Sequence, residues 1–200
     1  MSNEGNRFHR KYTSLFQKPR CRYKVITGGR GSGKSFAVAS ALLRRTYEDG
    51  YNVLFTRWTM DSAKDSVIPE FKDKMERLGV SHHFYEWRTS VQNLGTKAKV
   101  LFRGLKTSSK NQIAKMKSLF GIKIWVLDEA QELVPEQVDA ILATLSASST
   151  GTRQIIYTGT PTPPSSAGTV FARIRGEALT GKLTDCIWHE WGSLELPPLT

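Results

Sequence analysis

The chain has 200 residues and a formal net charge of +11, from 29 Lys and Arg against 18 Asp and Glu. The chain has only two cysteines, which argues against a disulfide-rich protein. It has no apolar run near the roughly 20 residues that span a bilayer and no apolar core at its N-terminus, which argues against a membrane-spanning or signal-bearing chain. The excess of positive charge attracts polyanions such as nucleic acid, although a solvated basic surface without a partner is an alternative.

The first predicted strand, residues 22–27, leads into a glycine-rich loop. From Gly28 to Ser35 the sequence reads GGRGSGKS, which matches the phosphate-binding pattern G-x-x-x-x-G-K-[ST]. Glycines let the backbone wrap round phosphates, Lys34 adds a cation, and the Ser35 hydroxyl can bind Mg²⁺. A predicted helix starts at Phe36, and its N-terminus favours a bound anion. The predicted nucleotide-binding residues here are Gly28, Gly29, Arg30, Gly31, Ser32, Gly33, Lys34, Ser35 and Phe36.

Short β-branched or aromatic runs alternate with helical stretches along the rest of the chain. The apolar runs are residues 53–55, 100–102, 122–127 and 155–157, and the helical stretches are 36–48, 62–78 and 135–145. Residues 83–87 and 90–94 are expected to add antiparallel strands beside the strand at 100–102. The alternation predicts an α/β domain with a mainly parallel central sheet and helices on both faces.

Two acids follow the apolar strand at residues 122–127. Burial of that strand would fix Asp128 and Glu129 at the carboxyl edge of the sheet, where nucleotides bind in this architecture. Asp128 can hold Mg²⁺ opposite Ser35, and Glu129 can orient the attacking water. A strand-end pair of acids is often only a cap, but this pair stands about ninety residues after a phosphate loop. The pattern therefore predicts hydrolysis of a nucleoside triphosphate.

A further strand, residues 52–57, is predicted between the loop and the acids. An inserted strand at this position is typical of ATPases that couple hydrolysis to mechanical work. The strand at 155–157 ends in Thr158-Gly159-Thr160-Pro161. Thr158 is placed to sense the γ-phosphate and relay its loss. An ordinary strand-end turn is the alternative.

With these elements assembled, the chain resembles the ATPase half of the large terminase subunit of tailed bacteriophages, the motor that packages DNA into proheads. The likeness covers nearly all of the chain. Its motifs are RYKV-x-x-GGRGSGKS from Arg22 to Ser35, Asp65-Ser66-Val67, LFRGL at 101–105 before a Lys-rich stretch, and Lys117-Ser118-Leu119 before the acidic strand. The resemblance implies a P-loop NTPase of the ASCE type (additional strand, catalytic glutamate), with ATP as substrate and Mg²⁺ as cofactor.

The resemblance also implies roles for single residues. Arg30 would reach the γ-phosphate or Glu129, so that Glu129, Arg30 and Lys34 form the catalytic set. Residues expected near the adenine are Gln17, Arg22 and Tyr23. Thr158 and Thr160 match the coupling motif, although the family often has Asn or Ser at the position of Thr160.

A ring motor of this family also needs an arginine from the neighbouring subunit. Arg88 and Arg103 are the foremost candidates, and Arg57 and Arg153 compete with them. The segment from Lys106 to Lys117 is either a DNA-facing surface or a solvated loop.

The resemblance implies double-stranded DNA, the portal protein and the small terminase subunit as partners, and self-association into a ring on the procapsid, without a membrane. The expected location is the host cell cytoplasm. Residues 1–193 are expected to form the motor domain, and 194–200 to begin a linker to a nuclease domain, so that no nuclease activity is expected in this chain. The alternatives are a helicase-type ATPase that depends on nucleic acid and a non-catalytic module that binds nucleotide and DNA.

Overall fold

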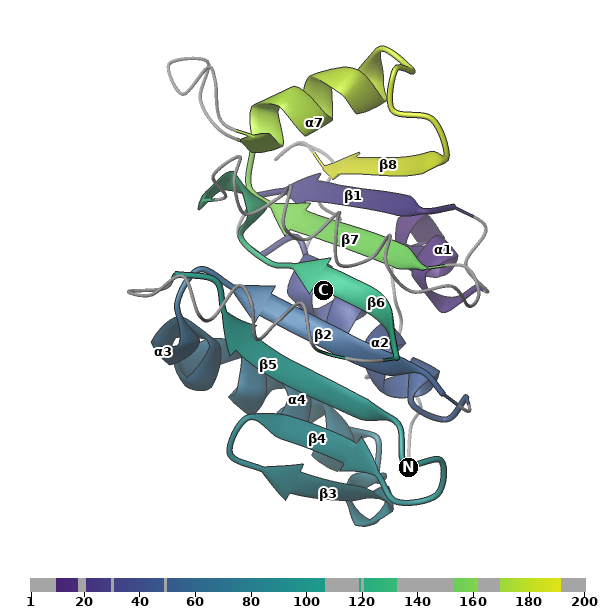
Figure 1. The fold of residues 1–200 in the computed structure, drawn as a ribbon, viewed down its shortest axis with the longest axis vertical. Coiled ribbons are helices and arrows are strands. Elements are labelled where there is room, and N and C mark those ends of the chain that lie inside the picture. Colours follow the sequence, from purple (N-terminus) through teal and green to yellow (C-terminus); the bar gives the residue numbers. More distant parts are fainter. Residues whose placement is uncertain are drawn as a thin grey trace.

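The computed structural model describes residues 10–17, 21–29, 31–48, 50–106, 119, 121–132, 153–161 and 170–191. These residues form an eight-stranded sheet in the order β3-β4-β5-β2-β6-β7-β1-β8 (Figure 1). The strands are β1 (Tyr23–Gly28), β2 (Asn52–Arg57), β3 (Phe84–Trp87), β4 (Ser90–Asn93), β5 (Lys99–Gly104), β6 (Ile122–Leu127), β7 (Gln154–Gly159) and β8 (Cys186–Trp191). Strands β1, β2, β5, β6, β7 and β8 run parallel, and β3 and β4 pair as an antiparallel hairpin beside β5. The predicted mainly parallel sheet is confirmed.

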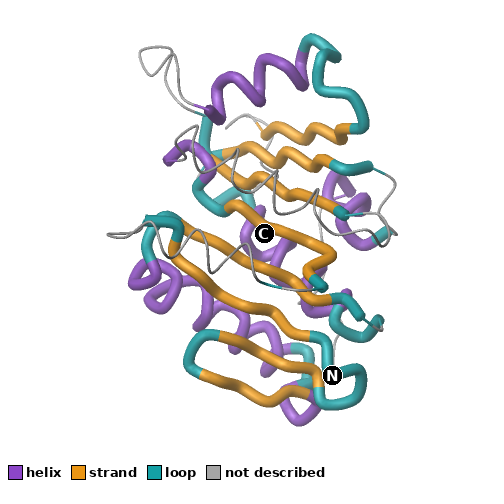
Figure 2. Tube along the Cα trace, viewed as in Figure 1, coloured by secondary structure: helices purple, strands orange, loops and turns teal. Residues whose placement is uncertain are grey.

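The described helices are mostly short (Figure 2). They are η2 (Arg10–Tyr12), α1 (Thr13–Phe16), α2 (Lys34–Arg45), α3 (Met60–Ser62), the π-helical turn η3 (Ala63–Val67), α4 (Ile68–Arg77), η4 (Ser81–His83), η5 (Ala130–Glu132) and α7 (Val170–Leu179). The helix predicted at 62–78 is thus a succession of α3, η3 and α4 rather than one α-helix. The helix predicted at 135–145 lies outside the described residues. Among the residues that the structure describes, no helix has the length and apolar character needed to cross a bilayer.

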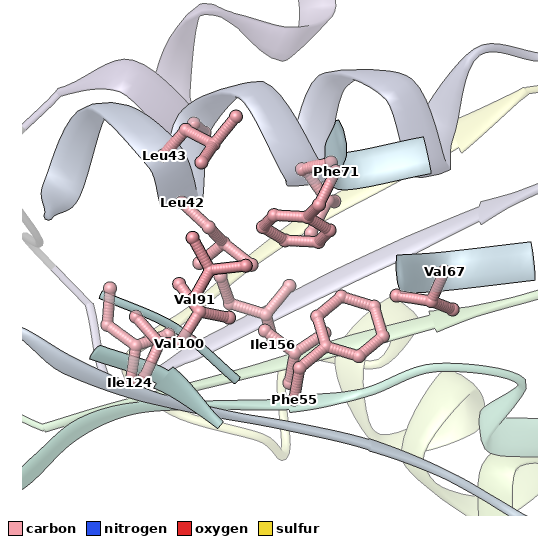
Figure 3. Close-up of a cluster of buried hydrophobic side chains, with 14 of the residues drawn as sticks. Leu42, Leu43, Phe55, Val67, Phe71, Val91, Val100, Ile124 and Ile156 are labelled. Carbon is pink, nitrogen blue, oxygen red and sulfur yellow. The ribbon is translucent and has the colours of Figure 1, made fainter. Parts of the chain in front are cut away.

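Helices cover both faces of the sheet. On one face, Phe55, Ile124 and Ile156 from the strands pack against Leu42 of α2 and Phe71 of α4 (Figure 3). Alternate residues of the same strands point the other way, because successive side chains of a strand face opposite sides. On that second face the buried cluster includes Val25, Leu54, Trp125 and Tyr157, with Val170, Phe171 and Ile174 of α7.

The strand order brings four chain segments to one edge. Parallel pairing sets Thr27 of β1 beside Gly159 of β7, and Leu127 of β6 beside both Tyr157 of β7 and Thr56 of β2. The carboxyl ends of β1, β7, β6 and β2 therefore lie side by side, which is where ligands bind in sheets of this class.

Candidate functional site

A cavity of about 320 Å³ opens at this carboxyl edge. Its lining comes from the loop after β1, the first turn of α2, and the ends of β2, β6 and β7. The lining residues are Gly31, Lys34, Ser35, Arg57, Asp128, Glu129, Gln131, Gly159 and Thr160. Its walls are therefore glycines, hydroxyls and charged side chains, which suit a polar, charged ligand.

The loop after β1 has the backbone of a phosphate cradle. Gly31 and Gly33 have φ of 80° and 76°, in the left-handed region that side chains other than glycine rarely adopt. Helix α2 begins at Lys34 without a side-chain cap or an acid in its first turn, so its N-terminus favours a bound anion. The Lys34 ammonium donates to the carbonyls of Gly28 and Gly29 at 3.1 and 3.3 Å.

Charges on the opposite wall face this lysine. Burial lowers the pKa of Lys34, while the nearby carboxylates of Asp128 and Glu129 act in the other direction. Asp128 is only 6% exposed. Burial raises the pKa of Asp128, against the hydrogen bond donated by the Thr158 hydroxyl and the charge of Arg57. Lys34, Asp128 and Glu129 therefore interact electrostatically across the cavity.

Arg57, at the end of β2, spans this wall. Its Nη2 donates to Oε1 of Glu129, and its Nε lies 3.5 Å from Oδ2 of Asp128. Its Nη1 donates to the Ser62 carbonyl at 3.2 Å and to the Ser66 hydroxyl. Arg57 is one of the arginines considered above for donation to a neighbouring subunit. In the structure its side chain is hydrogen-bonded within its own chain.

Gln131 is a site residue that was not predicted from the sequence, and Gly159 was named only as part of the Thr158-Gly159-Thr160-Pro161 motif, without a role of its own. The side-chain oxygen of Gln131 accepts a hydrogen bond from the backbone N–H of Thr160 at 3.2 Å. A Cβ on Gly159 would lie 2.8 Å from that oxygen and 2.9 Å from the Phe171 ring, so only glycine fits there without a shift. A glutamine two residues after the acidic pair was the available signal in the sequence.

Residues 20–173 match the family described as phage terminase large subunit. The chain belongs to this family.

Known large terminases share sequence and fold with the chain. The PBSX phage terminase large subunit of Bacillus subtilis (strain 168) is 23% identical over 124 residues, 62% of this chain and 28% of that protein. A large terminase from a thermophilic bacteriophage, solved in complex with ADP, has a TM-score of 0.71 and 12% identity, over 96% of this chain and 48% of that one. The HK97 bacteriophage large terminase has a TM-score of 0.72 and 12% identity, over 98% of this chain and 41% of that one. The chain therefore spans less than half the length of each of these terminases.

The structure places most of the expected terminase nucleotide-site residues together. The predicted residues that line the cavity are Gly31, Lys34, Ser35, Asp128, Glu129 and Thr160. Gly28, Gly29, Ser32 and Gly33 form the loop around it, and Phe36 lies in the first turn of α2 with the Lys74 ammonium 4.0 Å from its ring centre. Thr158 is 1% exposed and does not line the cavity, but its hydroxyl contacts Asp128. Arg30 lies outside the described residues.

The residues expected near the adenine are not brought to the cavity. Tyr23 begins β1, five residues before Gly28, so its backbone lies about 16 Å away along the strand. Arg22 precedes it, at the edge of the sheet opposite the cavity. Gln17 follows α1, and its carbonyl accepts a hydrogen bond from Arg45 at the far end of α2. The geometry gives no support to an adenine role for Arg22 and Tyr23, because they lie at the start of β1 and the loop follows its other end.

The two foremost arginines for donation to a neighbouring subunit differ in their surroundings. Arg103 Nη1 is held by its own chain, with the Phe102 carbonyl at 2.7 Å and the Thr89 carbonyl and hydroxyl at 3.4 and 3.3 Å. Arg88 is exposed in the turn between β3 and β4. Arg103 is therefore hydrogen-bonded within its own chain, whereas Arg88 is accessible, and both remain predicted candidates. Of the basic segment at 106–117, only Lys106 is described.

Proposed function

We propose that this chain hydrolyses ATP as the motor domain of a phage large terminase, translocating double-stranded DNA into the procapsid. The observation that carries the proposal is the meeting of Lys34 and Ser35 with Asp128 and Glu129 in one cavity. Membership of the terminase large subunit family supports it, as does the complex of the thermophilic-phage terminase with ADP.

The side chains in the cavity fit a magnesium ion. Ser35 and Asp128 offer a hydroxyl and a carboxylate, the hard oxygen ligands that Mg²⁺ prefers. Within the part of the chain that the structure describes, no three His, Cys, Asp or Glu side chains gather to hold a metal. This suits an ion that takes its other ligands from nucleotide phosphates and water. Bound there, Mg²⁺ would neutralise charge on the phosphate oxygens.

The chain's own residues then divide the work of hydrolysis. The loop N–H groups and Lys34 hold the phosphates, and Lys34 leaves the carbonyls of Gly28 and Gly29 to do so. Glu129 orients the attacking water and accepts its proton, and Arg30 stabilises charge on the γ-phosphate. The backbone of Thr160 is hydrogen-bonded to Gln131, and the hydroxyl of Thr158 to Asp128. Through these contacts the loss of the γ-phosphate is transmitted to β7.

Two lysine variants test the nucleotide site. Lys34→Ala should abolish Mg²⁺-dependent ATP turnover and weaken ATP binding, because the phosphate-facing cation is gone. Lys72→Ala removes the same charge from a surface lysine on α4 that is paired with Glu86, and it should leave both unchanged. Turnover that survives Lys34→Ala would contradict the proposal.

The partners follow from the family and the charge of +11. Double-stranded DNA is the translocated substrate, and the portal protein and small terminase subunit are the docking partners, in the host cell cytoplasm. Arg88 is the arginine offered to the neighbour in a ring. If so, Arg88→Ala and Glu129→Gln proteins, each inactive alone, regain turnover when mixed. An Arg88→Ala protein with wild-type turnover in the assembled ring would rule Arg88 out.

We propose residues 1–193 as the motor unit, although residues 192–200 lie outside the described residues. A chain ending at residue 193 should keep the ATPase rate of the 200-residue chain. Loss of turnover in the shorter chain would contradict this boundary.

A further inference from the structure

The segment that precedes β1 contacts the phosphate loop. Tyr12, the last residue of η2, is only 3% exposed, and its hydroxyl donates to the Ser32 carbonyl at 2.8 Å across 20 positions of the sequence. Burial raises the pKa of Tyr12 to about 12, so the hydroxyl keeps its proton at neutral pH and remains a donor. The loop is thus held from outside by a side chain that does not line the cavity.

Close packing does not fix the backbone of this loop. Apart from the chain neighbours, no atom lies within 4 Å of a Cβ placed on Gly29, Gly31 or Gly33. The Lys34 ammonium holds two carbonyls of the loop, but it must release them to reach bound phosphates. The hydrogen bond from Tyr12 needs no such release, because the tyrosine is not a phosphate-binding group. It can therefore hold the loop both before and after a nucleotide binds.

The same hydrogen bond sets the direction of a backbone N–H group. In a planar trans peptide, the carbonyl of one residue and the N–H of the next point to opposite sides. Because the Ser32 carbonyl is turned to Tyr12, the Gly33 N–H is turned away from it. Gly33 is the N-cap of α2, and Lys34 and Ser35 directly after it line the cavity. The bond therefore selects one orientation of the peptide at the anion-binding end of α2.

Two strands fix the place of the segment that carries Tyr12. The Ser14 hydroxyl lies 2.8 Å from Nε2 of His189 in β8, and the Ser14 carbonyl accepts a hydrogen bond from the Lys24 ammonium in β1. Leu15 is buried in the same core cluster as Tyr12. The tyrosine hydroxyl thus projects to the loop from a segment that is anchored on the sheet.

We propose that Tyr12 is a positioning residue of the phosphate loop: its hydroxyl, anchored on the sheet through Ser14, presets the Ser32–Gly33 peptide for phosphates and does not contact the base. The proposal rests on the proposed ATPase function. Two other roles for Tyr12 give different results. A tyrosine that only stabilises the fold would change unfolding and not nucleotide affinity. A tyrosine that contacts adenine would matter for ATP and not for tripolyphosphate, which has three phosphates and no base.

The first test compares Tyr12→Phe with wild type in the 200-residue chain, with Mg²⁺ in excess. Phenylalanine keeps the buried ring and removes only the hydroxyl. The KM for ATP and the inhibition constant of tripolyphosphate should both rise by roughly 3- to 10-fold, as expected for one lost hydrogen bond. The kcat should stay within about threefold, because Glu129 is unchanged. The matched control is Tyr85→Phe, which removes the hydroxyl of a tyrosine that is 53% exposed on β3 and should change none of these values.

A double-mutant cycle tests the anchoring of the segment. Ser14→Ala removes the contact with His189 and keeps the backbone hydrogen bond to Lys24. It should raise the KM for ATP by about two- to threefold in the wild-type background and add nothing to Tyr12→Phe, since it acts through the tyrosine hydroxyl. The unfolding midpoint of each variant shows that the assays compare folded proteins. If Tyr12→Phe fails to fold, Ser14→Ala carries the same comparison of ATP with tripolyphosphate.

Each other outcome is distinguishable. Unchanged binding of ATP and tripolyphosphate in folded Tyr12→Phe overturns the proposal while the ATPase function stands. Weaker binding of ATP alone overturns it and makes Tyr12 a base contact. Tripolyphosphate that does not compete with ATP in wild type shows that the loop is not preset for phosphates. Additive effects of Ser14→Ala and Tyr12→Phe overturn the anchoring through Ser14. A wild-type chain that neither binds nor hydrolyses ATP overturns the proposed function instead.

Discussion

The side-chain oxygen of Gln131 and the backbone N–H of Thr160 are hydrogen-bonded at 3.2 Å, which ties the turn after the acidic strand to the end of β7. The bond is possible because Gly159 has no side chain: a Cβ there would lie 2.8 Å from the same oxygen. The glycine between Thr158 and Thr160 thus serves a close approach across the cavity wall.

Gly159→Ala should therefore break this tie. We expect a loss of roughly 1–3 kcal/mol in the free energy of unfolding, because Gln131 and Phe171 must shift, and a clear fall in ATP turnover. The control is Gly176→Ala in α7, where nothing lies within 4 Å of the added carbon. There alanine should stabilise the helix by about 0.5–1 kcal/mol. Denaturant unfolding and ATPase assays of both variants decide the matter, and equal stability for the two would contradict the account.

The buried Lys24 predicts a pH-dependent stability. Its side chain is 1% exposed on β1, and its ammonium donates to the Ser14 carbonyl. Burial lowers the pKa of Lys24 from 10.5 to about 8. Between these values the unfolded chain binds more protons than the folded one, so stability rises with pH across this window. The cost is fully present below pH 8, is about 3 kcal/mol, and is lost as the pH approaches 10.5.

Lys24→Met should remove this dependence. Urea unfolding of both proteins at several pH values gives their difference in stability directly. We expect the advantage of Lys24→Met over wild type to shrink by about 2.5 kcal/mol from pH 7 to about pH 10. Two curves that stay parallel over this range would show that Lys24 does not carry the effect.

DNA binding should depend on salt and not on sequence. With a net charge of +11, release of counterions from phosphates is the expected driving force. Raising the salt from about 50 to 200 mM should weaken binding by roughly ten- to a hundredfold, as for a few phosphate contacts. Titrations of two duplexes of unrelated sequence at both salt concentrations check this. Affinity that ignores salt, or that differs strongly between the duplexes, would contradict DNA translocation as the function.

Site residues that belong to a local sequence motif could be predicted. Contacts between residues on strands that are distant in the sequence could not. The loop at Gly28–Ser35 and the acids at 128 and 129 are specified by chemistry that must occur at fixed spacing, and the described residues among them fall at the predicted edge. Arg57 is the last residue of a correctly predicted strand, yet its contact with Glu129 depends on β2 lying beside β6.

Elsewhere, long-range packing prevailed over local patterns. Strand β8 (Cys186–Trp191) was missed, and it is held in the sheet by pairing with β1 although residues 186–190 are partly exposed. The helical pattern at 62–78 did not reveal η3, because a π turn is a single local turn within a longer helical stretch. Arg22 and Tyr23 are close to the loop in sequence but at the other end of β1.

The central claim is that Glu129 orients the water that attacks ATP, and one comparison tests it most directly. ATP turnover and ATP affinity are measured for wild type, Glu129→Gln and Glu132→Gln. Glu132 is an exposed carboxyl three residues further on and does not line the cavity. The account predicts that Glu129→Gln lowers turnover by roughly 10²–10⁴-fold at nearly unchanged affinity, and that Glu132→Gln keeps the wild-type rate. Wild-type turnover in Glu129→Gln would contradict it.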